Sequence, residues 1–350
     1  MKKPVKNWVW MLLSVILLSL PWWGVTSLSL FFAFVPLLLI ERRTSAKAFI
    51  GYAILTLVLW HLSTLWWVGF AAVIGVVAAT LAGTVLFSIP LIIYTLARRR
   101  APKALAYTLL VSGWIAAEYL YLNGEISFPW LVLGNGFAVS PRLVQWYDTL
   151  GALGGSLWVW IVNLTVLEAA GKSGRKRWLA PALLILLPIL CSLVIFYTYR
   201  EKDNPVSVHI IQPNIDPYNE KFDGLSQEAQ ASIIERLSRK APKNVDYIIA
   251  PETAIDDNVT VGRIESNPIV AELHRFMQTE YPHSELLIGS VLYTLYPDRT
   301  ELPTPTARRL GNNVFYDVSN ASLQIGRQDT IPYYLKSKLV IGVEMLPYPE

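Results

Sequence analysis

Long apolar runs dominate the first 200 residues of the chain and predict membrane-spanning helices. A helix that crosses a bilayer needs about 20 predominantly apolar residues, and seven runs approach or exceed that length. The first two runs are short and are separated only by residues 21–24, so they could form a tight helical hairpin. The predicted spans are residues 8–20, 22–40, 48–70, 72–97, 104–122, 153–170 and 178–198.

From about residue 201 the pattern changes to that of an α/β domain. Alternating apolar residues predict strands, and apolar residues three or four positions apart predict amphipathic helices. Asn267 followed by Pro268 is a helix start signal. The order of these elements predicts an open sheet with helices on a face. The predicted strands are residues 206–212, 246–250, 285–292, 312–318 and 322–326, and the predicted helices are residues 225–239 and 268–279.

The basic residues of the first half lie in alternate turns between the predicted spans. Cytoplasmic loops are enriched in Lys and Arg, so we expect a cytoplasmic N-terminus that is retained as a first span. Seven spans would then place the domain 201–350 outside the cytoplasm. Arg142 is the only basic residue in the loops on the opposite side. The basic side is formed by Lys2, Lys3, Lys6, Arg42, Arg43, Lys47, Arg98, Arg99, Arg100, Lys103, Lys172, Arg175, Lys176 and Arg177.

One loop on the opposite side, residues 123–152, is apolar and aromatic but interrupted by Gly and Pro. Irregular backbone does not cross the hydrocarbon region exposed to lipid, so we expect this loop to lie in the membrane interface. The ionisable groups inside the spans are His61, Glu118 and Glu168, too few to favour an ion-coupled transporter. Glu118 is interpreted either as an interface carboxylate bonded to a neighbouring helix or as a residue that shapes a lipid or substrate entrance.

Composition supports a membrane protein and excludes several kinds of site. Hydrophobic residues make up 53% of the 350 positions and charged residues only 16%, below the about 25% of soluble domains. Cys191 is the single cysteine, so no disulfide can form within the chain and no cysteine-rich metal site is expected. The four histidines are scattered, and the sequence indicates neither a metal nor a soluble cofactor.

Two short segments of the second half carry candidate chemistry. Glu252 follows the predicted strand 246–250, and reactive groups collect past the carboxyl ends of strands in open sheets. We expect this carboxylate to be partly desolvated, which suits a general base. On a predicted strand over residues 334–344, Lys336 and Lys338 would share one face. A lysine beside the base could stabilise a developing oxyanion.

Together with other motifs, these segments resemble the apolipoprotein N-acyltransferase family, membrane-embedded members of the nitrilase superfamily. Ile211-Gln212-Pro213-Asn214-Ile215 is similar to the family's entry strand, and Pro251-Glu252-Thr253-Ala254-Ile255 to the block around its glutamate. The spacing of Tyr334, Lys336, Lys338, Leu339, Val340 and Glu344 is similar to its lysine block. Phe128-Pro129-Trp130-Leu131, with Gly134, Gln145, Gly151, Gly154 and Ser156, resembles its membrane loop and following helix.

The resemblance implies a polytopic helical membrane domain (1–200), followed by an incomplete α/β nitrilase-like domain of the αββα sandwich type (201–350). It implies a bacterial inner-membrane enzyme with Glu252 as general base, Lys336 as stabiliser of the tetrahedral intermediate and Glu344 as an auxiliary acid. A cysteine would take an acyl group from a phospholipid as a thioester. The α-amine of a lipid-anchored apolipoprotein, on its diacylglyceryl-cysteine, would then accept that group. No cofactor, metal or nucleic acid is implied.

The family's nucleophilic cysteine is expected beyond Glu350. Cys191 lies in the middle of the last apolar run, where an apolar environment leaves a thiol unreactive. We therefore expect the chain to be a C-terminally truncated fragment that is inactive as given. Two other functions remain open, namely a non-catalytic membrane scaffold that binds lipid or lipoprotein, and a membrane-tethered nitrilase-type amidase.

Overall fold

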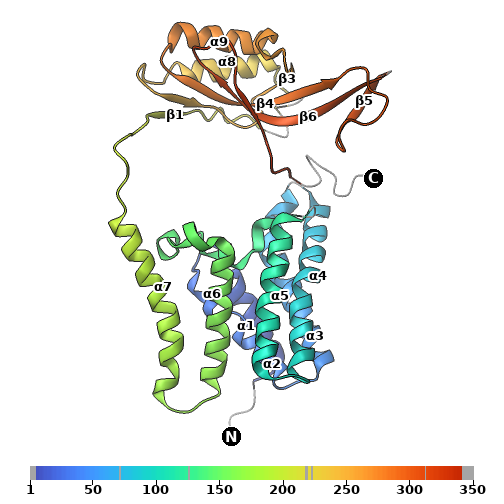
Figure 1. The fold of residues 1–350 in the computed structure, drawn as a ribbon, viewed down its shortest axis with the longest axis vertical. Helices are drawn as coiled ribbons and strands as arrows, with labels where there is room; N and C mark the ends of the chain where they lie inside the picture. Colours follow the sequence, from blue (N-terminus) through green and yellow to red (C-terminus); the bar gives the residue numbers. More distant parts are fainter. Residues whose placement is uncertain are drawn as a thin grey trace. The chain divides into compact units, whose positions relative to one another are not determined.

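The computed structural model of the protein describes residues 5–70, 72–124, 127–216, 220–221, 224–311 and 313–340. The chain divides into two compact units, Met1–Arg200 and Glu201–Glu350. The first is a helical bundle and the second contains a sheet with two helices (Figure 1).

The first unit contains seven α-helices within its described residues. Five segments are long and apolar enough to cross a membrane, and they correspond to the last five predicted spans. The first two apolar runs form the shorter helical segments Asn7–Ser19 and Leu28–Glu41. At 1.5 Å per residue, the 13 residues of the first reach only about 20 Å of the about 30 Å hydrocarbon core. The helices are α1 (Asn7–Ser19), α2 (Val35–Glu41), α3 (Ala46–Leu65), α4 (Val73–Arg98), α5 (Lys103–Asn123), α6 (Tyr147–Ala170) and α7 (Leu179–Thr198).

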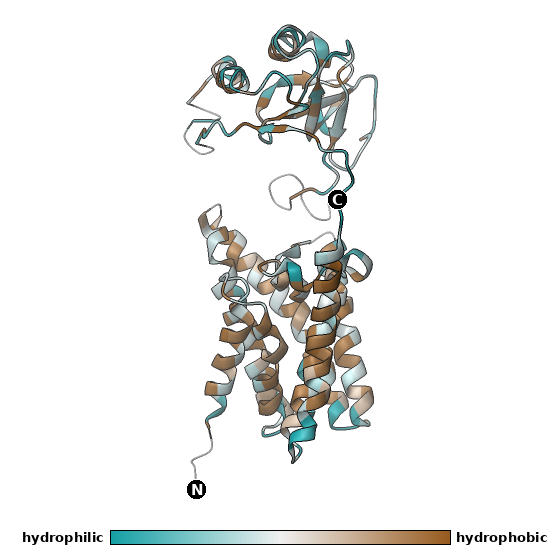
Figure 2. Cartoon of the chain, turned by 90° about the vertical axis from the view of Figure 1, so that its left-hand side faces the viewer, coloured by the Kyte–Doolittle hydropathy of each residue, from teal (hydrophilic) through white to brown (hydrophobic). Residues whose placement is uncertain are grey.

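Aromatic side chains fill the interior of the bundle. The ring of Phe34 stacks on Trp160 with centroids 4.2 Å apart, and Phe87 stacks on Trp114 at 4.9 Å. Trp114 and Trp160 meet edge to face, so the two stacks form one continuous cluster. Large rings bury much apolar area in few residues. Because these helices are apolar on nearly all sides, the contacts between the rings give them a specific packing arrangement. Figure 2 shows the apolar residues that dominate these helices.

The predicted basic turns gather at one end of the bundle. Glu168, near the end of α6, pairs with Arg42 at 2.6 Å and with Lys103 at the start of α5. The Tyr107 hydroxyl donates to the same carboxylate at 2.7 Å. The turn after α2 and the start of α5, which are distant in sequence, therefore meet at one acidic group near the end of α6. Glu168 is thus part of an ion-pair network at the helix ends.

The second unit contains a seven-stranded mixed sheet with the order β1-β2-β4-β6-β5, in which β3 also pairs with β4 and β7 with β6. Strands β1, β2 and β4 are parallel, whereas β6 runs antiparallel to β4. Two helices, α8 (Gln227–Ser238) and α9 (Pro268–Glu280), lie on one side of it (Figure 1). The strands are β1 (Val208–Ile210), β2 (Tyr247–Ile249), β3 (Ile255–Thr260), β4 (Glu285–Tyr296), β5 (Arg308–Gly311), β6 (Val314–Ile325) and β7 (Tyr333–Leu335).

Most of the predicted elements of this unit are confirmed, and one prediction is wrong. The Asn267 side chain accepts hydrogen bonds from the backbone N–H groups of Ile269 and Val270, which is the expected helix cap. The predicted strands 312–318 and 322–326 are instead one strand, β6, because residues 319–321 continue to pair with β4. Strands β3 and β5 were not predicted, and β7 covers only the start of the strand expected over residues 334–344.

The two faces of the sheet have different surroundings. Ile248, Ile288 and Leu323 are fully buried in one core with Leu273 and Met277 of α9. Side chains alternate between the faces, so Gly289 and its partner Ser322 lie on the face opposite the helices. A mixed sheet with helices on one face is consistent with the predicted nitrilase-like domain.

Candidate active site

Glu252 lies in a tight turn between β2 and β3. The turn is held on β4 at two points, where Ala250 N donates to Leu287 O at 2.8 Å and Gly289 N donates to Pro251 O at 3.1 Å. Thr253 has a φ of 51°, in the left-handed region that non-glycine residues rarely adopt. The chain thus turns sharply at the end of a buried strand and projects the Glu252 side chain away from the core.

Gly289 allows this turn to cross the sheet. A Cβ at position 289 would lie 2.5 Å from Glu252 Cα and 2.7 Å from Pro251 O. Both contacts are with backbone, which cannot rotate away as a side chain can. Only glycine fits beneath the turn, and its lack of a side chain lets the backbone of Glu252 lie directly against β4.

Lys336, which directly follows β7, also contacts the Glu252 carboxylate. Its backbone N–H donates to Asn320 O at 2.8 Å, directly after β7 ends at Leu335. Its Nζ atom lies 3.1 Å from Glu252 Oε1, which is a charge-assisted hydrogen bond as well as an ion pair. The structure therefore brings together Glu252 and Lys336, which are 84 residues apart.

Asn320 of β6 also contacts this carboxylate. Its side-chain Nδ2 donates to Glu252 Oε1, the same oxygen that Lys336 contacts. Asn320 is not among the candidate residues named from the sequence. No local pattern distinguishes it, because its role depends on strand pairing between segments that are far apart in sequence.

A second lysine lies on the backbone side of the turn. Lys221 Nζ donates to Thr253 Oγ1 and approaches Glu252 O at 3.4 Å. Burial lowers the pKa of Lys221, while the negative charges of Glu252 and Asp256 partly oppose that shift. Lys221, like Asn320, is not among the site residues named from the sequence. The site thus combines one carboxylate with two cationic groups and a neutral amide.

Two expectations about these residues are wrong. The Glu252 side chain is 63% exposed, so it is not desolvated by its position at the strand end as expected. The predicted strand over residues 334–344 ends at Leu335, so Lys336 and Lys338 are not on a strand. The Lys336 side chain is 30% exposed, whereas Lys338 is an exposed residue. Glu344 lies outside the described residues.

The single cysteine is not part of this cluster. Cys191 is an exposed residue of α7 in the first unit, a helix made almost entirely of apolar residues. Among the described residues, no group of three or more His, Cys, Asp or Glu side chains could hold a metal ion. What the described site offers is a proton acceptor beside a cation, an arrangement suited to acyl transfer.

Glu118 of the membrane unit holds the irregular loop between α5 and α6. Its Oε1 atom accepts hydrogen bonds from Trp114 Nε1 at 2.9 Å and from Leu133 N at 2.8 Å. Nearby, Gly134 N donates to Ser156 Oγ at 2.9 Å. Of the two interpretations of Glu118, these bonds support the structural one, but the two donors belong to α5 itself and to the loop rather than to a neighbouring helix.

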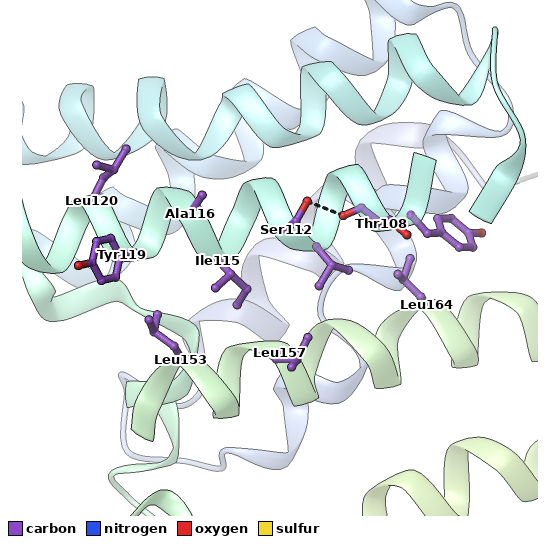
Figure 3. Close-up of a pocket in the computed structure, with 11 residues that line it drawn as sticks. Thr108, Ser112, Ile115, Ala116, Tyr119, Leu120, Leu153, Leu157 and Leu164 are labelled. Carbon is purple, nitrogen blue, oxygen red and sulfur yellow. Dashed lines mark hydrogen bonds between the residues drawn. The ribbon is translucent and has the colours of Figure 1, made fainter. Parts of the chain in front are cut away.

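A cavity of about 900 Å³ lies between α5 and α6 of the same unit. Figure 3 shows Ile115 of α5 pointing towards Leu153 and Leu157 of α6 across it, and Leu120 also lines it. Its few polar groups include Ser112, whose hydroxyl is occupied by a bond to Thr108 O at 2.8 Å. The cavity is therefore an apolar, open groove between two membrane-type helices.

Comparisons with known proteins agree with these features. Residues 11–165 match the profile of the apolipoprotein N-acyltransferase N-terminal domain. A protein of Chlorobaculum tepidum named apolipoprotein N-acyltransferase is 28% identical over 97% of this chain and 65% of its own length. One of the same name from Geobacter metallireducens is 30% identical over 72% of this chain and 52% of its own. The chain thus spans between about half and two thirds of these relatives.

The profile matches the helical unit, and the Chlorobaculum relative also covers nearly all of the sheet unit that carries Glu252 and Lys336. The multi-pass helical bundle and the mixed sheet occur in the order expected from the sequence motifs. The chain belongs to the apolipoprotein N-acyltransferase family.

Proposed function

We propose that the full-length protein transfers a fatty acyl group from a phospholipid to the N-terminal α-amine of a lipid-anchored apolipoprotein. The single observation that carries this proposal is the contact of 3.1 Å between Glu252 Oε1 and Lys336 Nζ. Two residues named from separate motifs lie in one site. The names of the relatives supply the reaction class and the acceptor.

In this proposal, Glu252 is the general base. Its carboxylate takes the proton from a cysteine thiol, and the thiolate attacks the ester carbonyl of the phospholipid. The Lys336 ammonium stabilises the resulting oxyanion. The intermediate then collapses to a thioester and releases a lysophospholipid. Attack of the apolipoprotein amine on the thioester forms the amide and restores the thiol, with Glu344 as an auxiliary acid.

The cysteine is proposed to lie beyond Glu350. Cys191, the one cysteine of the 350 residues, lies on an apolar helix, and such surroundings disfavour the thiolate. Sequencing the gene through to its natural stop codon tests this step first. A cysteine followed by a further apolar span supports the acyltransferase, whereas a stop codon directly after Glu350 in a stably expressed protein supports the membrane scaffold.

The proposed location is the bacterial inner membrane, with the N-terminus in the cytoplasm and the sheet unit outside it. The basic turns that meet at Glu168 support this orientation, because cytoplasmic loops are enriched in Lys and Arg. An alkaline phosphatase reporter fused after residue 240 is expected to be active. A cytoplasmic reporter that is active at the same position would contradict the orientation.

The function is tested on the protein expressed to its natural stop codon and supplied with labelled phospholipid. The wild-type protein is expected to form a labelled thioester, and Glu252→Gln is expected to lower its rate of formation by roughly 10²–10⁴. Normal thioester formation in Glu252→Gln would overturn the assignment of the base. A wild-type protein that binds phospholipid without a thioester would indicate the scaffold, and one that releases ammonia from amides would indicate the amidase.

A further inference from the structure

Asn320 connects the two residues of the proposed site. Its side chain donates to Glu252 Oε1, and its backbone carbonyl accepts from Lys336 N at 2.8 Å. One residue thus contacts the proposed base through its amide and fixes the backbone of the proposed cation through its carbonyl. Any shift of Asn320 would change the distance between the two charged groups.

The backbone of Asn320 is held on both sides. It pairs with Val291 of β4 on one side, and β7 pairs with the following residues Ala321 to Leu323 on the other. A short side chain on a strand paired along both edges has little freedom. Lys336, in contrast, reaches Glu252 with a long flexible side chain that follows the end of a strand.

A glutamate carboxylate has no strongly preferred rotation about its last bond. An exposed one, such as Glu252, therefore needs a fixed donor to hold it in one orientation. The contacts that described residues make with this carboxylate fall on Oε1, so Oε2 is the oxygen that we assign to accept a proton. The amide of Asn320 can hold the carboxylate in one orientation without adding a second positive charge beside the base.

We propose that Asn320 is a positioning residue that orients the Glu252 carboxylate, so that Oε1 is held by donors and Oε2 receives the proton of the nucleophile. This inference rests on the proposed function. Asn320 does not touch substrate in this proposal and acts through Glu252. Its removal should therefore slow acyl-enzyme formation and leave phospholipid binding unchanged.

The test compares Asn320→Ala and Asn320→Asp in the protein expressed to its natural stop codon. Hydrogen bonds to charged groups contribute about 1.5–3 kcal/mol, so kcat for thioester formation should fall roughly 10–100-fold in Asn320→Ala, with KM for phospholipid within about twofold. Asn320→Asp keeps the size but loses the donor and adds a like charge. It should lose more activity than Asn320→Ala.

Gln324→Ala is the matched control, because Gln324 is an exposed residue on the same strand and the same face of the sheet. It should retain wild-type kcat and KM, and a thermal unfolding curve of each variant shows that the fold is kept. Wild-type kcat in Asn320→Ala or in Asn320→Asp, an effect on KM alone, or an equal loss in Gln324→Ala would overturn the inference. In each of these cases an active wild-type protein leaves the proposed function intact, whereas an inactive wild-type protein shows that the proposed function itself has failed.

Discussion

Glu118 and Glu252, two of the glutamates named from the sequence, lie in opposite kinds of environment. Glu118 is fully buried and accepts hydrogen bonds from two neutral N–H donors, which tie an irregular loop to α5. Glu252 is 63% exposed, and a lysine ammonium and an amide donate to one of its oxygens. Both are hydrogen-bonded, but only Glu252 is open to another molecule.

This difference separates a structural carboxylate from a candidate catalytic one more clearly than burial alone would. A buried acid in a membrane bundle is a functional hypothesis by default, yet Glu118 bonds to Trp114 of its own helix and to Leu133 of the adjoining loop. Glu252 lies in a turn that packs on Gly289, and the ammonium groups of Lys221 and Lys336 contact its backbone and its side chain, respectively. The arrangement of donors thus distinguishes the two roles.

After Glu252→Gln, the largest effect is expected for Lys336→Ala in the protein expressed to its natural stop codon. If Lys336 stabilises the oxyanion, acyl transfer should fall roughly 10²–10³-fold, measured as the rate of thioester formation from labelled phospholipid. Lys338→Ala is the matched control, because Lys338 is an exposed lysine two residues away. An equal or greater loss in Lys338→Ala would assign the role to the other lysine and weaken the contrast drawn above.

The next effect is a loss of stability in Glu118→Ala. The substitution leaves Trp114 Nε1 and Leu133 N without their acceptor, at a cost of roughly 1–3 kcal/mol for each buried donor. The midpoint of thermal unfolding in detergent should fall, and Glu118→Gln, which keeps a carbonyl acceptor, should lose less. Reduced acyl transfer with an unchanged unfolding midpoint would instead favour the interpretation of Glu118 as part of a substrate entrance.

A smaller effect is expected for Gly289→Ala, which tests the turn beneath Glu252. The new Cβ would press on Glu252 Cα and Pro251 O, and overpacking of this kind costs roughly 1–3 kcal/mol. Both thermal stability and acyl transfer should fall because the turn must move. Gly311→Ala on β5 is the control, since a Cβ there meets no atom within 4 Å. Equal losses in the two variants would show that the close approach at Gly289 is unimportant.

The smallest effect concerns Asp246, a carboxylate that is exposed and hydrogen-bonded but lies outside the candidate site. Ser207 donates to it from its backbone N–H and from its hydroxyl, and these bonds lower the pKa of Asp246. Protonation weakens these bonds, so ionised Asp246 stabilises the folded state and protonated Asp246 does not. The stabilisation is complete above about pH 4, the ordinary aspartate value, and is lost as the pH falls through the lower value of the folded state.

Asp246→Asn should therefore reduce the acid dependence of the unfolding midpoint slightly and leave acyl transfer unchanged. The measurement is the unfolding midpoint of wild type and variant between about pH 3 and pH 7. A loss of acyl transfer in this variant would mean that an exposed hydrogen-bonded carboxylate affects activity wherever it lies. The distinction based on the partners of Glu252 would then fail.

The sequence by itself determined the elements whose stability depends on nearby residues. Apolar runs become membrane-type helices because all backbone hydrogen bonds of a helix are local, and Asn267 caps α9 through residues two and three positions away. The motifs around Glu252 and Lys336 could also be identified locally, so both residues were named as candidates.

Only the tertiary structure decided how these candidates are arranged. Asn320 was missed because its partners, Glu252 and Lys336, are remote in sequence and meet it through strand pairing. The exposure of Glu252 and the space at Gly289 depend on how a turn crosses another strand, and the unity of β6 depends on the long partner β4. Local patterns determine the elements, whereas contacts between distant segments determine the geometry of a site.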